Sequence, residues 1–526
     1  MTGADAARRR VLLNSVANAL GTLIPIPVVL MMVPFTLAHV GREGYGAWAL
    51  VGAFVGMVQL ADFGLTAAVT RTIAFHHARG ERGGVLAALH SATLLFSCIG
   101  VAVFVLALLL WPLLARSLFA GTRLPLGEVR AAFLGATAVF VAALATSAFT
   151  SLLDGLQRIG LQNAIRLGSI LVNAGGVWLA LNARHGLRGL VEGSAASVAF
   201  RIAALLLAAP FVFPGALSLP PRVSRGELRR LTAFSSRISV VQLSGVAYYQ
   251  VPKVYLRLAS SLATVGLYDV VAGQMQRFQE AVTGLVYPFL PALATHSAGD
   301  GEAAHAEARA LYRTAHRFMA ALVVPFVALL AVIAGPFARV WLGPAYGFLG
   351  PVFIANSVGT GALILTAPAH YTLIGYARMR PDVERATLSI ILALTLVWFG
   401  ATRGGLLGAA AANSLTAVAA LAWLQMRSRG LHVMTGGGGA ILRDYARTAA
   451  ACVPAALAAW AAVHAMHEGW GAIAAAVAAF VAVLLPAALA LRVVTADDVR
   501  QLRSMLASRS TPLPHVETVP LPGELP

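Results

Sequence analysis

Charged residues are scarce in this sequence of 526 residues: they make up 11% of the chain, whereas hydrophobic residues make up 59%. A soluble protein carries about 25% charged residues. The mean hydropathy is +0.78, and apolar runs of about 20 residues, the length of a membrane-spanning helix, recur from end to end. The composition therefore predicts an all-α polytopic membrane protein.

Lysine is almost absent, since Lys253 is the only one. A Walker A loop needs a lysine after its glycines, and Lys253 instead follows Pro252, so nucleotide binding by that motif is excluded. No Asp-x-Asp pair occurs among the nine aspartates, which argues against many metal-dependent glycosyltransferases. His467-Glu468 lacks a second histidine at the spacing of zinc proteases. We therefore expect no catalytic residues, no cofactor and no metal site.

Cysteine is equally rare, and Cys98 and Cys452 both lie in apolar runs, which predicts buried free thiols. The net charge of +18 comes from basic residues dispersed among the loops between spans, which argues against a nucleic-acid partner. No loop is long enough for a soluble domain, so a membrane-bound sugar transferase is disfavoured.

Fourteen membrane-spanning helices are predicted from the apolar runs, which puts both termini on the same side. Arginine indicates which side, because cytoplasmic loops are enriched in it. The two termini and the loops on their side hold 27 arginines, whereas the opposite loops hold nine. We therefore expect both termini in the cytoplasm. The predicted spans lie near 11–38, 46–69, 85–113, 131–153, 164–182, 189–212, 235–257, 264–292, 316–340, 348–373, 386–402, 405–426, 447–466 and 471–494.

Both ends of the chain carry further signals. Arg8 to Arg10 precede an apolar run that is too long for a signal peptide, so we expect the first helix to be retained. Gly436 to Gly439 predict a flexible linker. The tail after Arg509 has five prolines and is expected to be disordered.

Glycines at equivalent places of the predicted spans indicate an internal repeat. The matched pairs are Gly46 and Gly266, 220 residues apart, Gly155 and Gly375, also 220 apart, and Gly189 and Gly405, 216 apart.

The repeat predicts two pseudo-symmetric six-helix lobes in the same orientation, at 1–212 and 235–430, joined by a cytoplasmic linker at 213–234. Residues 431–494 would add two helices, and 495–526 would form a cytoplasmic proline-rich tail. Such repeats are typical of transporters that rock two bundles around a central site.

Charged residues gather in the seventh and eighth predicted spans: Lys253, Arg257, Asp269, Arg277 and Glu280. Each charge at membrane depth costs about 2.5–3.5 kcal/mol on insertion scales, so such residues face a protein interior or a wet cavity. Further polar candidates share helix faces by their spacing, or lie singly within a span: Gln242 and Tyr249 with Lys253, Gln276 with Glu280, Asn14 with Asn18, Gln59 with Asp62, and Arg201 alone.

Two interpretations of these charges stay open. Taken together they favour an aqueous cavity between the lobes, but single residues could form internal ion pairs, such as Arg277 with Glu280 or Lys253 with Asp269. Arg201 could pair with Glu192 or extend toward the cytoplasm. The neighbouring Asp382 and Arg385 are interpreted as loop structure.

The chemistry of the cavity would suit an anion. Arginine binds diphosphate through its planar fork and lysine acts as a point charge, so we expect Lys253, Arg277, Arg257 and Arg201 to hold it, with Tyr249, Gln242, Asn14 and Asn18 as polar contacts. Asp62, Asp269 and Glu280 are candidates for carrying a coupling proton or sodium ion.

The residues from Pro34 to Trp48, PFTLAHVGREGYGAW, and then Asp62-Phe63-Gly64-Leu65 resemble the opening of bacterial polysaccharide flippases of the Wzx type. These flippases belong to the multidrug/oligosaccharidyl-lipid/polysaccharide (MOP) superfamily. The second lobe is similar to them at Val265-Gly266-Leu267-Tyr268, Pro288-Phe289-Leu290-Pro291 and Pro344-Ala345-Tyr346, so the resemblance reaches about residue 426.

The resemblance implies a MATE-like fold with a cationic cavity, in the cytoplasmic (inner) membrane of a bacterium and with both termini in the cytoplasm. It implies transport of an undecaprenyl-diphosphate-linked oligosaccharide between leaflets, with membrane lipids and a polysaccharide polymerase complex as partners. Family members often carry an acidic residue just before the basic residue of the seventh span, and Pro252 stands there in this chain. The remaining alternatives are a flippase for the peptidoglycan precursor, a drug/cation antiporter, and a membrane scaffold without transport.

Overall fold

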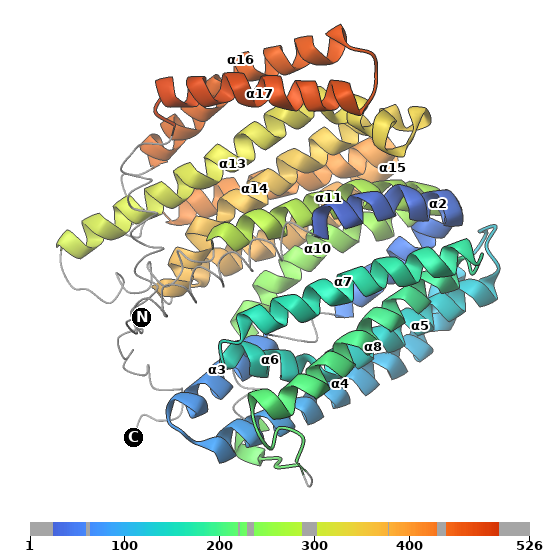
Figure 1. The fold of residues 1–526 in the computed structure, drawn as a ribbon. Helices are drawn as coiled ribbons and strands as arrows, with labels where there is room; N and C mark the ends of the chain where they lie inside the picture. The colour runs from blue at the N-terminus through green and yellow to red at the C-terminus, as the bar shows by residue number, and fades with distance from the viewer. Residues whose placement is uncertain are drawn as a thin grey trace, which may run out of the picture.

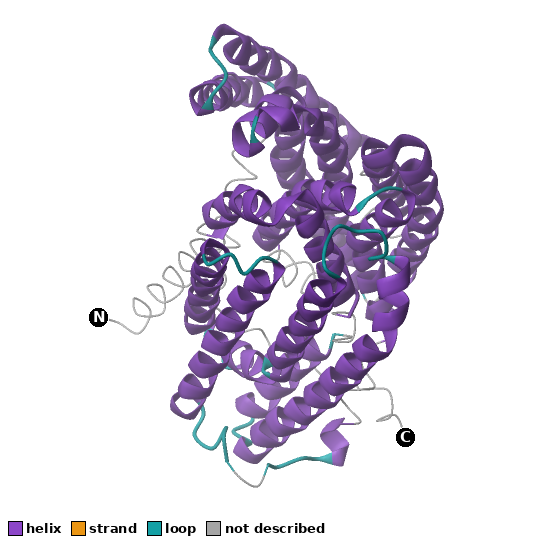
Figure 2. Ribbon diagram, turned by 90° about the vertical axis from the view of Figure 1, so that its right-hand side faces the viewer, coloured by secondary structure: helices purple, strands orange, loops and turns teal. Residues whose placement is uncertain are grey.

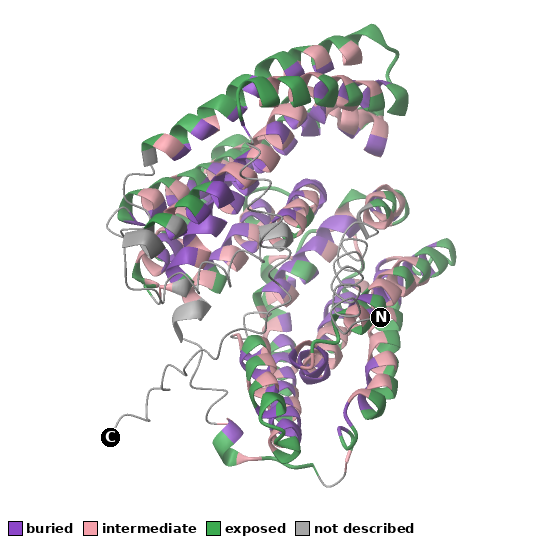
Figure 3. Cartoon of the chain, turned by 60° about the vertical axis from the view of Figure 1, so that its left-hand side comes forward, coloured by how far each residue is buried: buried purple, intermediate pink, exposed green. Residues whose placement is uncertain are grey.

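The regular elements of the computed structural model are all helices within the described part of the chain (Figure 2). Nine segments of this part are long and apolar enough to cross a membrane. Large apolar side chains point away from the protein, such as Leu109, Phe211 and Leu489, which are 72%, 89% and 73% exposed. Figure 3 shows exposed positions along the outer faces of the helices. An apolar surface of this extent is typical of contact with lipid, so the chain is a multi-pass membrane protein. The described residues are 25–58, 64–218, 221–228, 236–286, 302–376, 378–428 and 438–493.

Two groups of helices and a final pair follow one another along the chain (Figure 1). We call the first group the first lobe: α2 (Pro25–Val58), α3 (Leu65–Ala78), α4 (Arg82–Ser117), α5 (Leu126–Ala145), α6 (Ser147–Gly155), α7 (Ile159–Asn182) and α8 (Leu187–Val212). We call the second group the second lobe: α10 (Ser236–Ala259), α11 (Leu262–Val286), α13 (Glu302–Leu342), the 3-10 helix η2 (Pro344–Leu349), α14 (Gly350–Gly375) and α15 (Arg380–Arg427). The final pair, α16 (Gly438–Ala465) and α17 (Trp470–Ala490), packs against α13.

The predicted all-helical membrane fold is confirmed in the described residues, where α15 contains two predicted spans and α2 contains parts of two. α2 bends at Gly41 (φ 70°, ψ 174°) and α15 bends at Gly405 (φ 54°, ψ −134°). Glycine is needed at both bends because residues with a side chain rarely adopt positive φ. The exact boundaries of the lobes, the linker 213–234 and the tail 495–526 stay predictions.

The third glycine pair of the repeat was matched three residues out of register. Gly186, just before α8, has φ 56° and ψ −135°, which is the conformation of Gly405. The equivalent of Gly405 is therefore Gly186, 219 residues earlier, and not Gly189. Both Gly186 and Gly189 are followed by leucine, so the dipeptide alone did not identify the glycine that makes the turn.

α2 joins the two lobes. It packs against α5, α7 and α8 of the first lobe and against α10 and α11 of the second. A single hydrophobic core runs through these contacts, from Leu50 on α2 to Val271 on α11, which are 4% and 0% exposed. The candidate site lies beside this junction.

Candidate functional site

The lobes meet most closely where the second half of α2 crosses α11. A Cβ atom at Gly46 would lie 1.8 Å from the carbonyl oxygen of Leu262, and one at Gly266 would lie 2.9 Å from that of Arg42. Leu262 and Arg42 each precede the facing glycine of their own helix by four residues, so the contact is two-fold symmetric. This symmetry agrees with the offset of 220 residues between Gly46 and Gly266.

Arg257 links the two lobes by hydrogen bonds near the same crossing. Its Nε donates to the carbonyl oxygen of Leu118 at 2.5 Å and its Nη2 to that of Ala120 at 2.7 Å. The guanidinium thus bridges the end of α10 to the segment after α4. We call this side of the molecule the closed end. Further links between the lobes are the 3.2 Å hydrogen bond from Arg42 Nε to the Tyr346 hydroxyl and the 2.8 Å hydrogen bond from Trp341 Nε1 to the Leu30 carbonyl.

Arg277 reaches from α11 of the second lobe into a cavity of the first. This first-lobe cavity has a volume of about 170 Å³ and is lined by α2, α7 and α8. Arg277 follows Gly266 by eleven residues, which places it roughly 16 Å along the helix from the closed end, about half the depth of a bilayer core. Among the described residues that line the cavity it is the only charged one.

The Arg277 guanidinium is exposed and has little protein contact. Its hydrogen bond within the described chain is from Nη1 to the Gly273 carbonyl, at 3.4 Å. Glu280, considered as its partner, instead accepts a 3.1 Å hydrogen bond from Gln276. Arg277 can therefore offer its planar fork to an anion in the cavity.

Lys253 and Asp269 form the internal ion pair that the sequence left as an alternative. Lys253 Nζ lies 2.7 Å from Asp269 Oδ1, and Lys253 is 8% exposed. The pair balances both charges where α10 packs against α11.

The remaining predicted residues with described positions lie apart from Arg277. Arg201 donates from Nη2 to the Ala143 carbonyl at 2.8 Å, next to the break between α5 and α6. Glu192, its proposed partner, accepts instead from His185 at 2.6 Å. Gln242 is exposed on α10. Three candidates, Asn14, Asn18 and Asp62, lie outside the described residues, as do Gln59, the arginines at 8–10, Gly436, Gly437 and the proline-rich tail.

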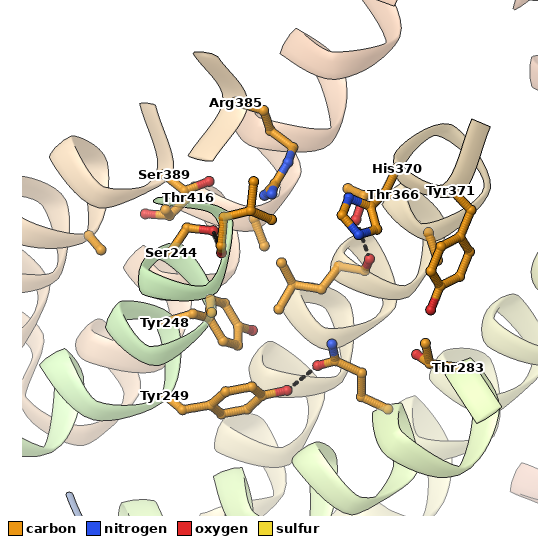
Figure 4. A pocket seen from close by; sticks show the side chains of 17 residues that line it. Ser244, Tyr248, Tyr249, Thr283, Thr366, His370, Tyr371, Arg385, Ser389 and Thr416 are labelled. Carbon is orange, nitrogen blue, oxygen red and sulfur yellow. Dashed lines mark hydrogen bonds between the residues drawn. The ribbon is translucent and has the colours of Figure 1, made fainter. Parts of the chain in front are cut away.

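Asp382 and Arg385 are not loop residues. They lie in the first turns of α15, 0% and 6% exposed, and Arg385 Nε donates to Asp382 Oδ1 at 2.6 Å. His370 Nδ1 lies 2.6 Å from the other carboxylate oxygen. Arg385 and His370 line a second cavity, also of about 170 Å³, between α10, α11, α14 and α15 (Figure 4). We call it the second-lobe cavity. Tyr249 lines it and donates a short hydrogen bond to Gln279.

Sequence analysis missed several polar residues of the first-lobe cavity. They are Thr36, Tyr45, Trp48, Asn173 and Ser194. A signal was present for Asn173, because Arg166, Ser169 and Asn173 follow the 3-4 spacing of one helix face in the fifth predicted span. No group of three histidine, cysteine or acidic side chains that could hold a metal is found in the described residues.

A sequence model for a family described as polysaccharide biosynthesis protein matches residues 40–347, more than half of the chain. The chain belongs to this family. A Shigella flexneri protein whose name describes it as an O-antigen transporter is 38% identical over 88 residues, which are 16% of this chain. The match spans about a fifth of that relative, 21% of its length.

Solved structures agree on the fold of this member of the polysaccharide biosynthesis family. The lipid II flippase MurJ in an inward closed conformation has a TM-score of 0.62 at 12% identity, covering 94% of this chain and all of its own. A multidrug resistance MATE family transporter of the MOP superfamily, inward-facing, has a TM-score of 0.55 at 16% identity, covering 78% of this chain and 98% of its own. The family match and the O-antigen transporter relative bear out the resemblance to polysaccharide flippases of the Wzx type, and the solved structures show the fold that the resemblance implied.

Proposed function

We propose that the protein is a flippase that moves an undecaprenyl-diphosphate-linked oligosaccharide from the cytoplasmic to the outer leaflet of the bacterial inner membrane. The observation that carries the proposal is Arg277, an exposed cation at about mid-depth that reaches from one lobe into a cavity of the other. Membership of the polysaccharide biosynthesis family supports this role.

Arg277 would hold the diphosphate, because a guanidinium can donate two parallel hydrogen bonds to phosphate oxygens. Asn173 on α7 and Ser194 on α8 line the same cavity and would contact polar groups near the phosphates. The lipid tail would stay in the bilayer beside the lobes. Lys253 would bind the substrate only if its ion pair with Asp269 opened.

Transport would proceed by alternating access. With both termini in the cytoplasm, the closed end is the outer side, so the described conformation is closed to the outside. Opening there requires that Arg257 release the carbonyls of Leu118 and Ala120. A proton or sodium ion could drive the step through Asp62, Asp269 or Glu280, and contact with a polymerase complex also stays a prediction.

A peptidoglycan-precursor flippase is the second candidate, favoured by the likeness to MurJ in fold. A drug antiporter fits less well, because the charged residue lining the first-lobe cavity is a cation and would repel cationic drugs.

Deletion of the gene in its native bacterium tests the proposal. Lipids from inverted and right-side-out membrane vesicles would be compared for diphosphate-linked oligosaccharide on each face. The proposal expects accumulation on the cytoplasmic face with loss of surface polysaccharide. Normal polysaccharide would contradict it. An inviable deletion that stays inviable when the upstream sugar transferase is also deleted would favour the peptidoglycan precursor.

A further inference from the structure

The second-lobe cavity is separate from the cavity that Arg277 enters, and α11 stands between the two. Gln279 and Thr283 on α11 line the second-lobe cavity, whereas Arg277 on the same helix lines the first-lobe cavity. Figure 4 shows the side chains of α10, α11, α14 and α15 around the second-lobe cavity. The two cavities therefore lie on either side of one membrane helix.

The size of the second-lobe cavity matches one six-membered ring. An apolar cavity of about 150 Å³ holds a benzene molecule, whereas drug-sized ligands occupy pockets of about 300–1,000 Å³. The volume here is about 170 Å³. A whole oligosaccharide does not fit, but a single ring does.

The lining combines apolar surface with several polar side chains, and one of these is a buried hydroxyl without a partner in the described chain. Ser389 is 7% exposed, and its Oγ makes no hydrogen bond within the described chain. Arg385, 6% exposed, uses Nε for Asp382 and has no further hydrogen bond to a described residue, and Figure 4 shows its guanidinium extending into the cavity. Buried donors and acceptors of this kind are normally satisfied, so a ligand in the cavity could accept hydrogen bonds from the Arg385 guanidinium and exchange them with the Ser389 hydroxyl.

The charges favour a neutral ligand. Among the described residues that line the cavity, none carries a carboxylate. The nearby carboxylate of Asp382 has its two oxygens engaged by Arg385 and His370, each at 2.6 Å, which leaves it poorly placed to bind a cation. The same carboxylate balances the charge of Arg385, so the cavity offers an anion little net attraction.

Aromatic faces complete the lining. Tyr248 and Tyr249 both line the cavity, with ring centroids 5.0 Å apart and planes at 88°. The negative face of an aromatic ring attracts weakly positive hydrogens, such as those on the C–H face of a sugar. A sugar ring also carries hydroxyl groups around its rim, which match Ser389, Gln279 and Arg385.

From the size, the unpartnered donors, the balanced charge and the tyrosines together, we propose that the second-lobe cavity binds a single neutral sugar ring. If the proposed function holds, this ring is one sugar unit of the transported oligosaccharide. The diphosphate would stay at Arg277, on the other side of α11, so that the two ends of the headgroup are recognised by different lobes.

The test is saturation-transfer NMR on the purified full-length protein in lipid nanodiscs. The probes are methyl glycosides of neutral hexoses and N-acetylhexosamines, with inorganic phosphate and glucuronate as comparators. We expect at least one neutral glycoside to bind in the millimolar range, and Ser389→Leu, which fills the cavity, to weaken binding at least 10-fold. Ser97→Leu, the matched change at a half-buried serine of α4 that lines neither cavity, should leave the affinity unchanged.

Ser389→Ala is a second variant, used in case Ser389→Leu does not fold, and it keeps the cavity open. It should weaken glycoside binding several-fold at an unchanged melting temperature. Binding of phosphate or glucuronate alone, or no binding at all, would overturn the inference. So would loss of glycoside binding in Ser97→Leu with retention in Ser389→Leu. Flipping by the wild-type protein in proteoliposomes, measured in parallel, separates the two proposals. A protein that flips lipid but shows no Ser389-dependent binding keeps the proposed function and loses this site.

Discussion

Lys253 Nζ lies 2.7 Å from Asp269 Oδ1, so the only lysine of the chain has its charge balanced by a neighbouring helix of the same lobe. The two side chains are 10% and 21% exposed, which makes the pair a largely buried one. Removal of one partner from a buried pair leaves an uncompensated charge, whereas replacement of both by apolar residues is often neutral.

Lys253→Met alone should therefore destabilise the protein by about 3–5 kcal/mol. Lys253→Met combined with Asp269→Leu should restore most of the loss. The measurement is thermal unfolding of the purified protein in detergent. If the double variant is stable but does not transport, Lys253 or Asp269 also acts in transport; if it is less stable than both single variants, the pair is not an isolated structural unit.

A second prediction concerns the close packing of α2 against α11. Gly46→Ala would place a methyl group 1.8 Å from the Leu262 carbonyl oxygen, which is possible only if the helices move apart. Overpacking of this kind costs about 1–3 kcal/mol. Gly52→Ala is the control, because no atom lies within 4 Å of its new methyl group, and alanine is favoured over glycine within a helix. Equal melting temperatures for the two variants would show that the lobes do not depend on this contact.

The hydrogen bonds of Arg257 to Leu118 and Ala120 are expected to stabilise the closed end. Arg257→Gln removes the hydrogen bonds to Leu118 and Ala120 and should increase the population that is open on that side. Asn173→Cys, introduced with Cys98→Ser and Cys452→Ser, places one thiol in the first-lobe cavity. In spheroplasts, a membrane-impermeant maleimide should label it several-fold faster when Arg257 is replaced. Unchanged labelling would mean that Arg257 does not hold the closed end.

The sequence predicted the helices well, because apolar runs of membrane length carry a strong signal. It could name Lys253–Asp269 only as one option, since the pairing depends on how α10 packs against α11. It placed Arg277 within the eighth predicted span. It could not show that the side chain enters the first-lobe cavity, because that contact depends on how the two lobes pack.

The interpretation of Asp382 and Arg385 failed for a local reason. Both lie between the predicted spans at 348–373 and 386–402, but the helix begins earlier than predicted, since Pro381 is well tolerated in its first turn. α15 begins at Arg380 and carries both residues into the second lobe. Asn173 was overlooked although Arg166, Ser169 and Asn173 share one helix face by the 3-4 spacing of a helix.

Binding of the lipid diphosphate should be most sensitive to substitution of Arg277. A hydrogen bond to a charged group contributes about 1.5–3 kcal/mol, which corresponds to a factor of about 10–150 in affinity. Arg277→Gln should reduce binding of a lipid diphosphate by that factor without loss of folded protein. Arg277→Lys should retain part of it, since lysine keeps the charge but loses the fork. Arg339→Gln, which breaks the exposed bridge to Glu468, is the control and should bind as the wild type does. Equal binding by Arg277→Gln would remove Arg277 from the site.

The most direct test of the central claim is reconstitution. The wild-type protein, Arg277→Gln and Arg339→Gln would each be placed in proteoliposomes with an undecaprenyl-diphosphate oligosaccharide from the native bacterium, and the lipid accessible to an external glycosidase would be followed in time. The account predicts rapid transfer between leaflets with the wild-type protein and Arg339→Gln, and transfer near that of empty liposomes with Arg277→Gln. Wild-type transfer no faster than that of empty liposomes, with folded protein present, would contradict it.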